Sequence, residues 1–306
     1  MIASQNTQYS PRPTVYAQQG PAIFIGGTGR SGTSLLQSVL GLHHLMAKIP
    51  EETKLMSLVF LPEILKELSW ANPVRRQEGI KTIKEVWAKL YAYRISWGKD
   101  PEAGKRGLFK FAEPQWVEQA LGQLDGLRPG ILEQEVFEVY GHMVSELFVR
   151  FAATLNKPLW VEKTPDNALM AGFIARCFGN LRLINIVRDG RDVACSLMDE
   201  PWGPNDPCEA LDWWAKRLTA SMDQVSRLPE PTHITIRYED LILSPELVLR
   251  RLITFLGLKW ESELLSHKFK RGSLGRFRKD LPAHAQTYAL EKYGDILRRL
   301  GYVSSS

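Results

Sequence analysis

Apolar residues gather in four short runs along the chain, and these runs predict the strands of one sheet. Residues 22–26 form such a run directly before a cluster of glycines, and residues 181–187 form the longest one. Short continuous apolar runs are typical of strands that are buried on both faces, as they are in a parallel sheet. The other two runs that we expect to form strands are 158–162 and 232–237.

Between these runs, apolar residues recur at intervals of three and four, which is the spacing of a helix with one buried face. An Asn72-Pro73 pair separates two such segments, and the Gly-, Lys- and Pro-containing stretch 98–112 predicts a loop. Alternating strands and helices favour the α/β class, with a single domain in which helices flank a central, mostly parallel sheet. The segments that we expect to be helical are 33–42, 53–69, 74–97, 131–155, 167–177, 190–199, 207–227, 245–256 and 284–300.

Composition narrows this picture only a little. The 306 residues are 44% hydrophobic and 24% charged, which is ordinary for a globular protein. A net charge of +5 suits an anionic ligand, and no block of like charges indicates a nucleic-acid partner. The three cysteines, Cys177, Cys195 and Cys208, form no CxxC pair, so the sequence predicts neither a disulfide framework nor a metal site.

The ends of the chain and its hydropathy suggest a cytoplasmic protein. No run of 18 apolar residues predicts a membrane span, and the polar first 20 residues lack the features of a secretory signal. We expect residues 1–20 to form a flexible arm and residues 21–306 to form the folded domain. Oligomerisation is left open.

The segment Gly26-Gly27-Thr28-Gly29-Arg30-Ser31-Gly32-Thr33-Ser34 predicts an anion site after the first strand. A glycine-rich loop that leads from a strand into a helix directs backbone N–H groups at a bound phosphate. Arg30 can add a charge-assisted hydrogen bond, and the hydroxyls of Thr33 and Ser34 can donate further bonds.

Three kinds of phosphate-containing ligand are candidates for this loop, and the sequence does not favour them equally. A nucleoside triphosphate loop has a lysine where Thr33 stands, and that lysine reaches the terminal phosphates. A dinucleotide loop matches Gly27, Gly29 and Gly32, with an acidic residue about 20 positions on, but no clear second strand precedes that acidic residue. A single 5′-phosphate that carries a sulfuryl group needs no such lysine.

A second candidate site follows the strand at 181–187. Arg188 stands where that strand ends, which is the edge at which α/β sheets bind their ligands. Ser196 lies two turns into the helix that we expect to begin near Gly190. Arg188 and Ser196 can therefore converge on a second phosphate.

Taken together, these motifs resemble the sulfotransferases that use 3′-phosphoadenosine 5′-phosphosulfate (PAPS), and most closely the protein-tyrosine sulfotransferase branch and its bacterial relatives. The resemblance spans roughly residues 22–302 and implies a P-loop-like sulfotransferase fold. It rests on the loop at 26–34 and on the stretch Val187-Arg188-Asp189-Gly190-Arg191-Asp192 with Ser196. It continues through Glu51-Glu52-Thr53-Lys54, Glu162-Lys163-Thr164-Pro165-Asp166-Asn167, Arg237-Tyr238-Glu239-Asp240-Leu241, Phe255-Leu256-Gly257-Leu258 and Gly275-Arg276-Phe277-Arg278-Lys279.

The resemblance implies a role for each matching position. The residues implied to bind the donor are Gly29, Arg30, Ser31, Gly32, Thr33, Ser34, Arg188, Ser196, Tyr238, Arg276, Arg278 and Lys279. Lys163 would contact the transferring sulfuryl group, and Glu52 would take the proton of the acceptor hydroxyl. Glu51 and Lys54 would lie near the acceptor. The two glutamates can exchange roles, because the stretch before them is one residue longer than expected, and a histidine base (His43 or His44) stays open.

The implied activity is sulfuryl transfer from PAPS, without a metal, to a hydroxyl or phenol acceptor. Glu200 stands where the tyrosine-specific branch has a basic residue, which favours a small metabolite over a peptide tyrosine as acceptor. Two alternatives are a nucleotide-dependent phosphotransferase and a module that binds adenosine bisphosphate without chemistry. The aromatic residues Trp213, Trp214 and those of 87–97 are expected in the core rather than around the acceptor.

Overall fold

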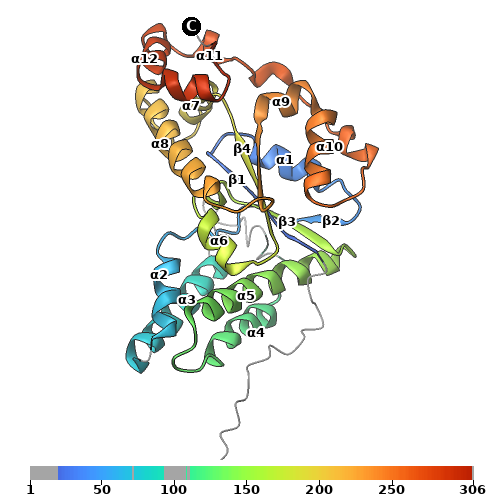
Figure 1. Cartoon of the computed structure of the whole chain (residues 1–306), viewed down its shortest axis with the longest axis vertical. Helices are drawn as coiled ribbons and strands as arrows, with labels where there is room; N and C mark the ends of the chain where they lie inside the picture. The colour runs from blue at the N-terminus through green and yellow to red at the C-terminus, as the bar shows by residue number, and fades with distance from the viewer. Residues whose placement is uncertain (1–19, 71, 93–107, 109–110, 305–306) are drawn as a thin grey trace, which may run out of the picture.

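The structure is a computed structural model that describes residues 20–70, 72–92, 108 and 111–304 (Figure 1). Five parallel strands form one sheet in the order β2-β3-β1-β4-β5. The strands are β1 Ala22–Gly27, β2 Met46–Lys48, β3 Leu159–Lys163, β4 Leu181–Val187 and β5 His233–Arg237. Because all five run the same way, their carboxyl ends meet at one edge of the sheet, where such folds bind ligands.

Both faces of the sheet are covered, since side chains of β1 alternate between two cores. Phe24 packs with residues of α5 and α6, whereas Ile23 and Ile25 pack with α1, α9 and α10. In Figure 1 these two sets of helices lie on opposite sides of the strands. The helices are α1 Thr33–Leu40, α2 Leu61–Ser69, α3 Pro73–Ala92, α4 Pro114–Asp125, α5 Glu133–Thr154, α6 Ala171–Cys177, α7 Gly190–Met198, α8 Pro207–Ser226, α9 Tyr238–Leu243, α10 Pro245–Phe255, α11 Phe277–Asp280 and α12 Ala283–Arg299.

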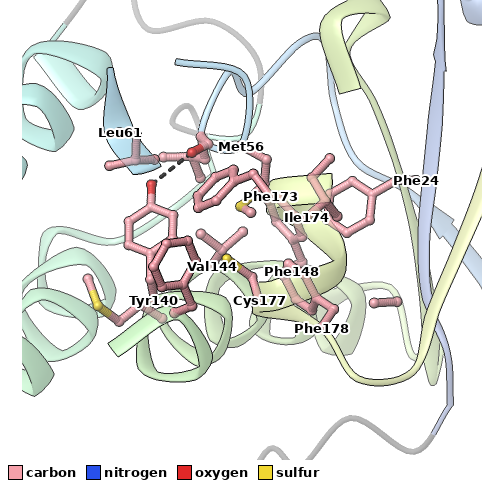
Figure 2. Packing of buried hydrophobic residues seen from close by; sticks show 14 of the residues in the cluster. Phe24, Met56, Leu61, Tyr140, Val144, Phe148, Phe173, Ile174, Cys177 and Phe178 are labelled. Atoms are coloured by element: carbon pink, nitrogen blue, oxygen red, sulfur yellow. Dashed lines mark hydrogen bonds between the residues drawn. The ribbon is translucent and has the colours of Figure 1, made fainter. Parts of the chain in front are cut away.

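The largest core cluster lies between the sheet and the helices α2 to α6. Figure 2 shows its aromatic side chains, with Phe24 of β1 and Phe148 of α5 among them. Tyr140 of α5 donates a hydrogen bond of 2.7 Å to the carbonyl of Leu55, and Trp87 Nε1 lies 3.2 Å from the same hydroxyl. The core thus reaches directly into the chain segment that follows β2.

A third cluster packs α7, α8 and α12 around the end of β4. It includes Val187, Trp214 and Phe277, all of which are buried. In Figure 1 these helices gather beside the carboxyl end of the sheet, close to the end of the chain. This cluster fixes the position of α7, which carries Ser196 into the candidate site.

The predicted single α/β domain with a parallel sheet is confirmed, and the four predicted strands agree with β1, β3, β4 and β5 to within one residue at each end. β2 was not predicted. The expected helix 53–69 begins only at Leu61, because Leu55 and Met56 are buried in a loop segment rather than along one helix face. The predicted arm 1–20 falls almost wholly outside the described residues, as do residues 93–97 of the expected helix 74–97 and most of the loop 98–112.

Three helices, α4, α9 and α11, were also not predicted. The remaining predicted helices agree with observed ones, although α6 begins four residues later than expected, after a short 3₁₀ turn at Pro165–Asn167. Within the described ranges, no helix combines the length and the apolar character that crossing a membrane requires.

Candidate active site

A cavity of about 1030 Å³ lies at the carboxyl edge of the sheet. Its lining comes from segments that follow all five strands, which is why residues far apart in sequence meet there. The lining comes from the loop after β1 and the start of α1, from β2 and the segment after it, from the ends of β3, β4 and β5, and from α7. It includes Gly29, Arg30, Gly32, Thr33, Ser34, Lys48, Pro50, Glu51, Glu52, Lys54, Lys163, Pro165, Asp166, Arg188, Ser196 and Tyr238.

The loop after β1 turns sharply into α1. Gly32 caps the helix with φ of 92°, and a Cβ at this position would stand 2.3 Å from the ring of Tyr238. Arg30 also has a positive φ, of 66°, although it is not a glycine. Strained backbone of this kind persists only where the surrounding structure fixes it, and it is common at ligand sites. Ser31 is buried against Thr28 and does not line the cavity.

Residues of α7 and of the turn after it hold the guanidinium of Arg30. Arg30 Nε donates to Ser196 Oγ at 3.0 Å, and its guanidinium forms an ion pair of 2.8 Å with Glu200. The loop thus contacts Ser196 directly, and the two residues that were predicted to converge, Arg188 and Ser196, both line the cavity. Glu200, which the sequence marked as an unusual residue, provides the carboxylate that neutralises Arg30.

Arg188 lies at the end of β4 beneath the loop. It donates to the carbonyls of Arg30 at 3.0 Å and Ser273 at 2.7 Å, and its guanidinium packs over the ring of Tyr238 at 4.6 Å. Its Nε is buried and has no hydrogen-bond partner among the described residues. A buried cationic N–H without a partner is unusual, so this donor suits an anion in the cavity.

Lys163 and Glu52 meet in the same cavity from β3 and from the segment after β2. Lys163 Nζ donates to Glu52 Oε1 at 2.9 Å. The lysine side chain is only 7% exposed, whereas that of Glu52 is 37% exposed. The two side chains that the resemblance assigns to catalysis therefore touch each other, and the carboxylate is the more accessible of the two.

The segment that carries Glu52 has an unusual backbone. Glu51 and Lys54 each have φ of 58°, in the left-handed region, and both line the cavity with Glu52. Thr53, between them, is buried. Two non-glycine residues with positive φ in four positions make this a strained turn, and in the conformation that it adopts Glu52 lies beside Lys163.

The segment with Arg276, Arg278 and Lys279 does not line the cavity. Arg276 forms ion pairs with Asp199 at 2.9 Å and Asp280 at 2.8 Å, Arg278 packs over Phe277, and Lys279 is exposed. Asp192 of α7 accepts hydrogen bonds from the backbone N–H of Gly275 and of Phe277, at 2.7 and 3.0 Å. The part of this stretch nearest the donor residues is Ser273, whose hydroxyl lies 2.7 Å from Tyr238 Oη.

Trp202, Trp213 and Arg217 also line the cavity, although the motifs did not single them out as site residues. Trp202 and Trp213 lie with ring centroids 6.3 Å apart, and Arg217 packs over Trp213 at 4.8 Å and pairs with Asp166. Trp214 and Trp87 are core residues as expected, but Trp213 is half-buried and faces the cavity. The sequence could have indicated Trp213 as a site residue through its spacing of four residues from Arg217 along α8.

His43 and His44 lie away from the cavity. Each approaches Glu261, and the three side chains bring one potential metal-ligand atom apiece within 4.8 Å of one another. His43 Nδ1 is the acceptor for the Leu45 N–H, and its Nε2 lies 3.0 Å from the Lys259 carbonyl. Neither ring lines the cavity, so the geometry favours a carboxylate rather than a histidine as the base there.

Comparisons with known proteins found similar sequences and similar structures. The model of the sulfotransferase family matches residues 21–262. Protein-tyrosine sulfotransferase A of Caenorhabditis elegans is 23% identical over 260 residues, which are 83% of this chain and 54% of that protein. Protein-tyrosine sulfotransferase 2 of Gallus gallus is 24% identical over 280 residues, which are 90% of this chain and 60% of that protein. The chain thus spans little more than half the length of these relatives.

Solved structures share the fold. The sulfotransferase domain from the Synechococcus PCC 7002 olefin synthase superposes with a TM-score of 0.57 at 18% identity and covers 94% of this chain and 97% of that one. The sulfotransferase domain from the curacin biosynthetic pathway superposes with a TM-score of 0.51 at 21% identity and covers 90% and 98%.

Proposed function

Because the chain belongs to the sulfotransferase family, we propose that it transfers a sulfuryl group from PAPS to a phenolic hydroxyl. One observation supports this most strongly. Arg30, Lys163 and Arg188, from the ends of three different strands, line one cavity in which Glu52 lies 2.9 Å from Lys163. Cations that converge on a cavity with an accessible carboxylate suit an anionic donor and an acceptor that must lose a proton.

In this proposal the donor lies across the ends of β1 and β4. The backbone of Gly32 to Ser34 at the start of α1, with the side chain of Arg30, holds the 5′-phosphosulfate. Arg188 and Ser196 hold the 3′-phosphate, and the unpartnered Nε of Arg188 supports this assignment. Tyr238, which packs between Gly32 and Arg188, lies beside the nucleotide.

The reaction is an in-line displacement at sulfur. The acceptor oxygen forms a bond to sulfur while the bond from sulfur to the 5′-phosphate oxygen breaks, and its electron pair leaves with adenosine 3′,5′-bisphosphate. Glu52 takes the proton of the acceptor hydroxyl. Lys163 stabilises the negative charge that develops on the bridging oxygen, together with the N-terminus of α1. The contact between Lys163 and Glu52 supports the assignment of both groups to one reaction centre.

We propose a phenol as the acceptor, for two reasons. The cavity has an aromatic side in Trp202 and Trp213, against which a phenol ring can pack. The curated relatives are named protein-tyrosine sulfotransferases, which supports a tyrosine phenol more than the sequence alone did. Glu200 in place of a basic residue remains the argument for a small phenol over an acidic peptide, since it adds negative charge beside Arg30.

The direct test is transfer from radiolabelled PAPS to a panel of small phenols, tyrosine peptides, sterols and sugars in a buffer without metal. We expect labelled phenolic product and release of adenosine 3′,5′-bisphosphate. Binding of the bisphosphate without transfer to any acceptor would favour the non-catalytic module instead. The absence of both transfer and a thermal shift with the bisphosphate would overturn the proposal.

Lys163→Ala separates donor binding from chemistry. We expect kcat to fall by about 10²–10³, since the variant loses one electrostatic donor to the transition state, while bisphosphate affinity changes little. Single-turnover kinetics with PAPS and isothermal titration with the bisphosphate measure the two effects. Lys48→Ala, at another cavity lysine, is the matched control. Turnover near that of the parent would remove Lys163 from the mechanism.

A further inference from the structure

Glu162 is a buried carboxylate directly beside the reaction centre. It precedes Lys163 at the end of β3, is 1% exposed and does not line the cavity. A carboxylate in such a place is costly unless hydrogen-bond donors surround it. Its contacts therefore show what it holds in position.

Four donors surround this carboxylate. Oε1 accepts from the Thr53 N–H at 3.3 Å, from Thr53 Oγ1 at 3.0 Å and from Thr164 Oγ1 at 2.7 Å. Oε2 accepts from Asn167 Nδ2 at 2.7 Å. An ionised carboxylate has only acceptor sites, whereas an amide of the same shape would turn one of these positions into a donor. Replacement of Glu162 by Gln would therefore disturb at least one of these contacts.

These contacts join three segments that carry site residues. Thr53 is the neighbour of Glu52, and Thr164 is the neighbour of Lys163. The Asn167 amide that donates to Glu162 also lies 3.1 Å from the carbonyl of Ile25, at the end of the strand that leads into the phosphate loop. Glu162 therefore contacts the neighbours of the base and of the lysine directly, and it reaches the strand before the donor loop only through Asn167.

The strain in the segment after β2 explains why an anchor is needed there. Glu51 and Lys54 adopt φ of 58° on either side of Glu52 and Thr53. Such a backbone relaxes unless other contacts fix it, and relaxation would turn Glu52 away from Lys163. Thr53 is held to Glu162 by both its backbone and its hydroxyl, so this pair of contacts fixes the strained turn in its register.

We propose that Glu162 is a positioning residue: by accepting both donors of Thr53, it holds Glu52 in contact with Lys163 and so places the base for the acceptor hydroxyl. This inference rests on the proposed function, in which Glu52 removes the acceptor proton. Displacement of a catalytic group by about 1 Å can cost roughly 10²-fold in rate. Donor binding, in contrast, depends on Arg30, Arg188 and the loop, which Glu162 does not touch.

The kinetic test compares Glu162→Gln with variants of its partner. We expect Glu162→Gln to lower kcat by about 10²-fold and Thr53→Val by about 10-fold, with bisphosphate affinity within twofold of the parent. Thr53→Ser keeps the hydroxyl and should restore most of kcat. Thr53→Val preserves the side-chain shape, so it tests the same contact even where Glu162→Gln impairs folding.

A matched control separates positioning from general loss of a buried carboxylate. Glu146 of α5 is also buried, with hydrogen bonds to Arg150 and Gln123, and does not line the cavity. Glu146→Gln should lower thermal stability and leave kcat unchanged. Unchanged kcat in Glu162→Gln, or an equal fall in bisphosphate affinity and kcat, would overturn the proposal.

Amide hydrogen exchange tests the anchor without any substrate. In Glu162→Gln we expect faster exchange at residues 51–57 and 163–167, and parent-like exchange in α5. If the parent shows no sulfuryl transfer, the proposed function fails while the exchange result still decides the anchor. Parent-like exchange at residues 51–57 in Glu162→Gln would overturn the positioning role whatever the activity.

Discussion

Arg188 combines several interactions that a motif in the sequence does not reveal. The sequence indicated an anion-binding arginine at a strand end, and the structure places Arg188 in the cavity at the end of β4. It also donates to two backbone carbonyls and packs on Tyr238, so it braces the loop as well as facing the cavity. Contacts between residues as distant as Arg188 and Ser273 depend on the tertiary fold, and no local pattern encodes them.

Arg188→Ala should weaken binding of adenosine 3′,5′-bisphosphate by at least about tenfold, because the variant loses charge-assisted hydrogen bonds. Isothermal titration measures the change. Arg182→Ala is the control: Arg182 is on the same strand, donates to the Phe255 carbonyl and does not line the cavity. Equal affinity in the Arg188→Ala variant and the parent would contradict the assignment of the 3′-phosphate site.

At the scale of elements, β1 and β4 were predictable because both are apolar runs buried on both faces. β2 has only three residues, Met46–Lys48, which is too short for any periodicity to show. The turn at residues 51–54 could not be predicted either, because its positive φ angles depend on the contacts of Thr53 with Glu162. The motifs identified Glu52 and Lys163, whereas their contact depends on this turn.

Gly32→Ala should disrupt the junction between the loop and α1. An alanine at φ of 92° is strained, and its Cβ would approach the Tyr238 ring at 2.3 Å. We expect the variant to fold less stably and to lose most bisphosphate binding. Gly122→Ala in α4 has open space around its Cβ and should raise stability by about 0.5–1 kcal/mol. Normal binding by Gly32→Ala would show that this junction tolerates a side chain.

Tyr140→Phe tests how the core supports the segment after β2. The variant leaves the Leu55 carbonyl and Trp87 Nε1 without their hydrogen bonds. Tyr140 itself lies within the buried cluster of Figure 2. We expect the free energy of unfolding to fall by about 1–3 kcal/mol, as measured by urea denaturation. Tyr288→Phe, at a half-buried hydroxyl bonded to Asp212, should cost less. If Tyr140→Phe and Tyr288→Phe lowered the free energy of unfolding equally, this account would be contradicted.

At the scale of the whole molecule, a charge of +5 coexists with several buried carboxylates close to the cavity. Burial raises the pKa of Glu162, Asp192 and Glu239 above their usual range, against the opposing effect of their hydrogen bonds. All three lie next to strand ends or helix starts that shape the cavity. The edge of the sheet that lines the cavity is therefore also where ionisation of these carboxyls opposes folding.

Comparison of the parent with Asp192→Asn should reveal how the raised pKa of Asp192 affects the pH dependence of stability. Between the unfolded pKa of about 4 and the raised folded pKa, the folded carboxyl binds the proton more readily, so the free energy of unfolding falls as pH rises. The parent should gain stability relative to the variant as pH falls from 7 into that window. Urea denaturation at several pH values measures the difference, and a constant or decreasing difference would contradict the sign.

The central place of β1 in the sheet has a consequence for synthesis on the ribosome. Ile23 pairs with Val161 on one side and with Arg182 on the other, so both neighbours of the first strand leave the ribosome long after it does. Until then the phosphate loop has no sheet beneath it, and both edges of β1 stay unpaired, which exposes them to wrong partners. Pairings between such distant residues also make folding slow. Synthesis of the N-terminal half is thus the stage at which β1 is most exposed to incorrect pairing.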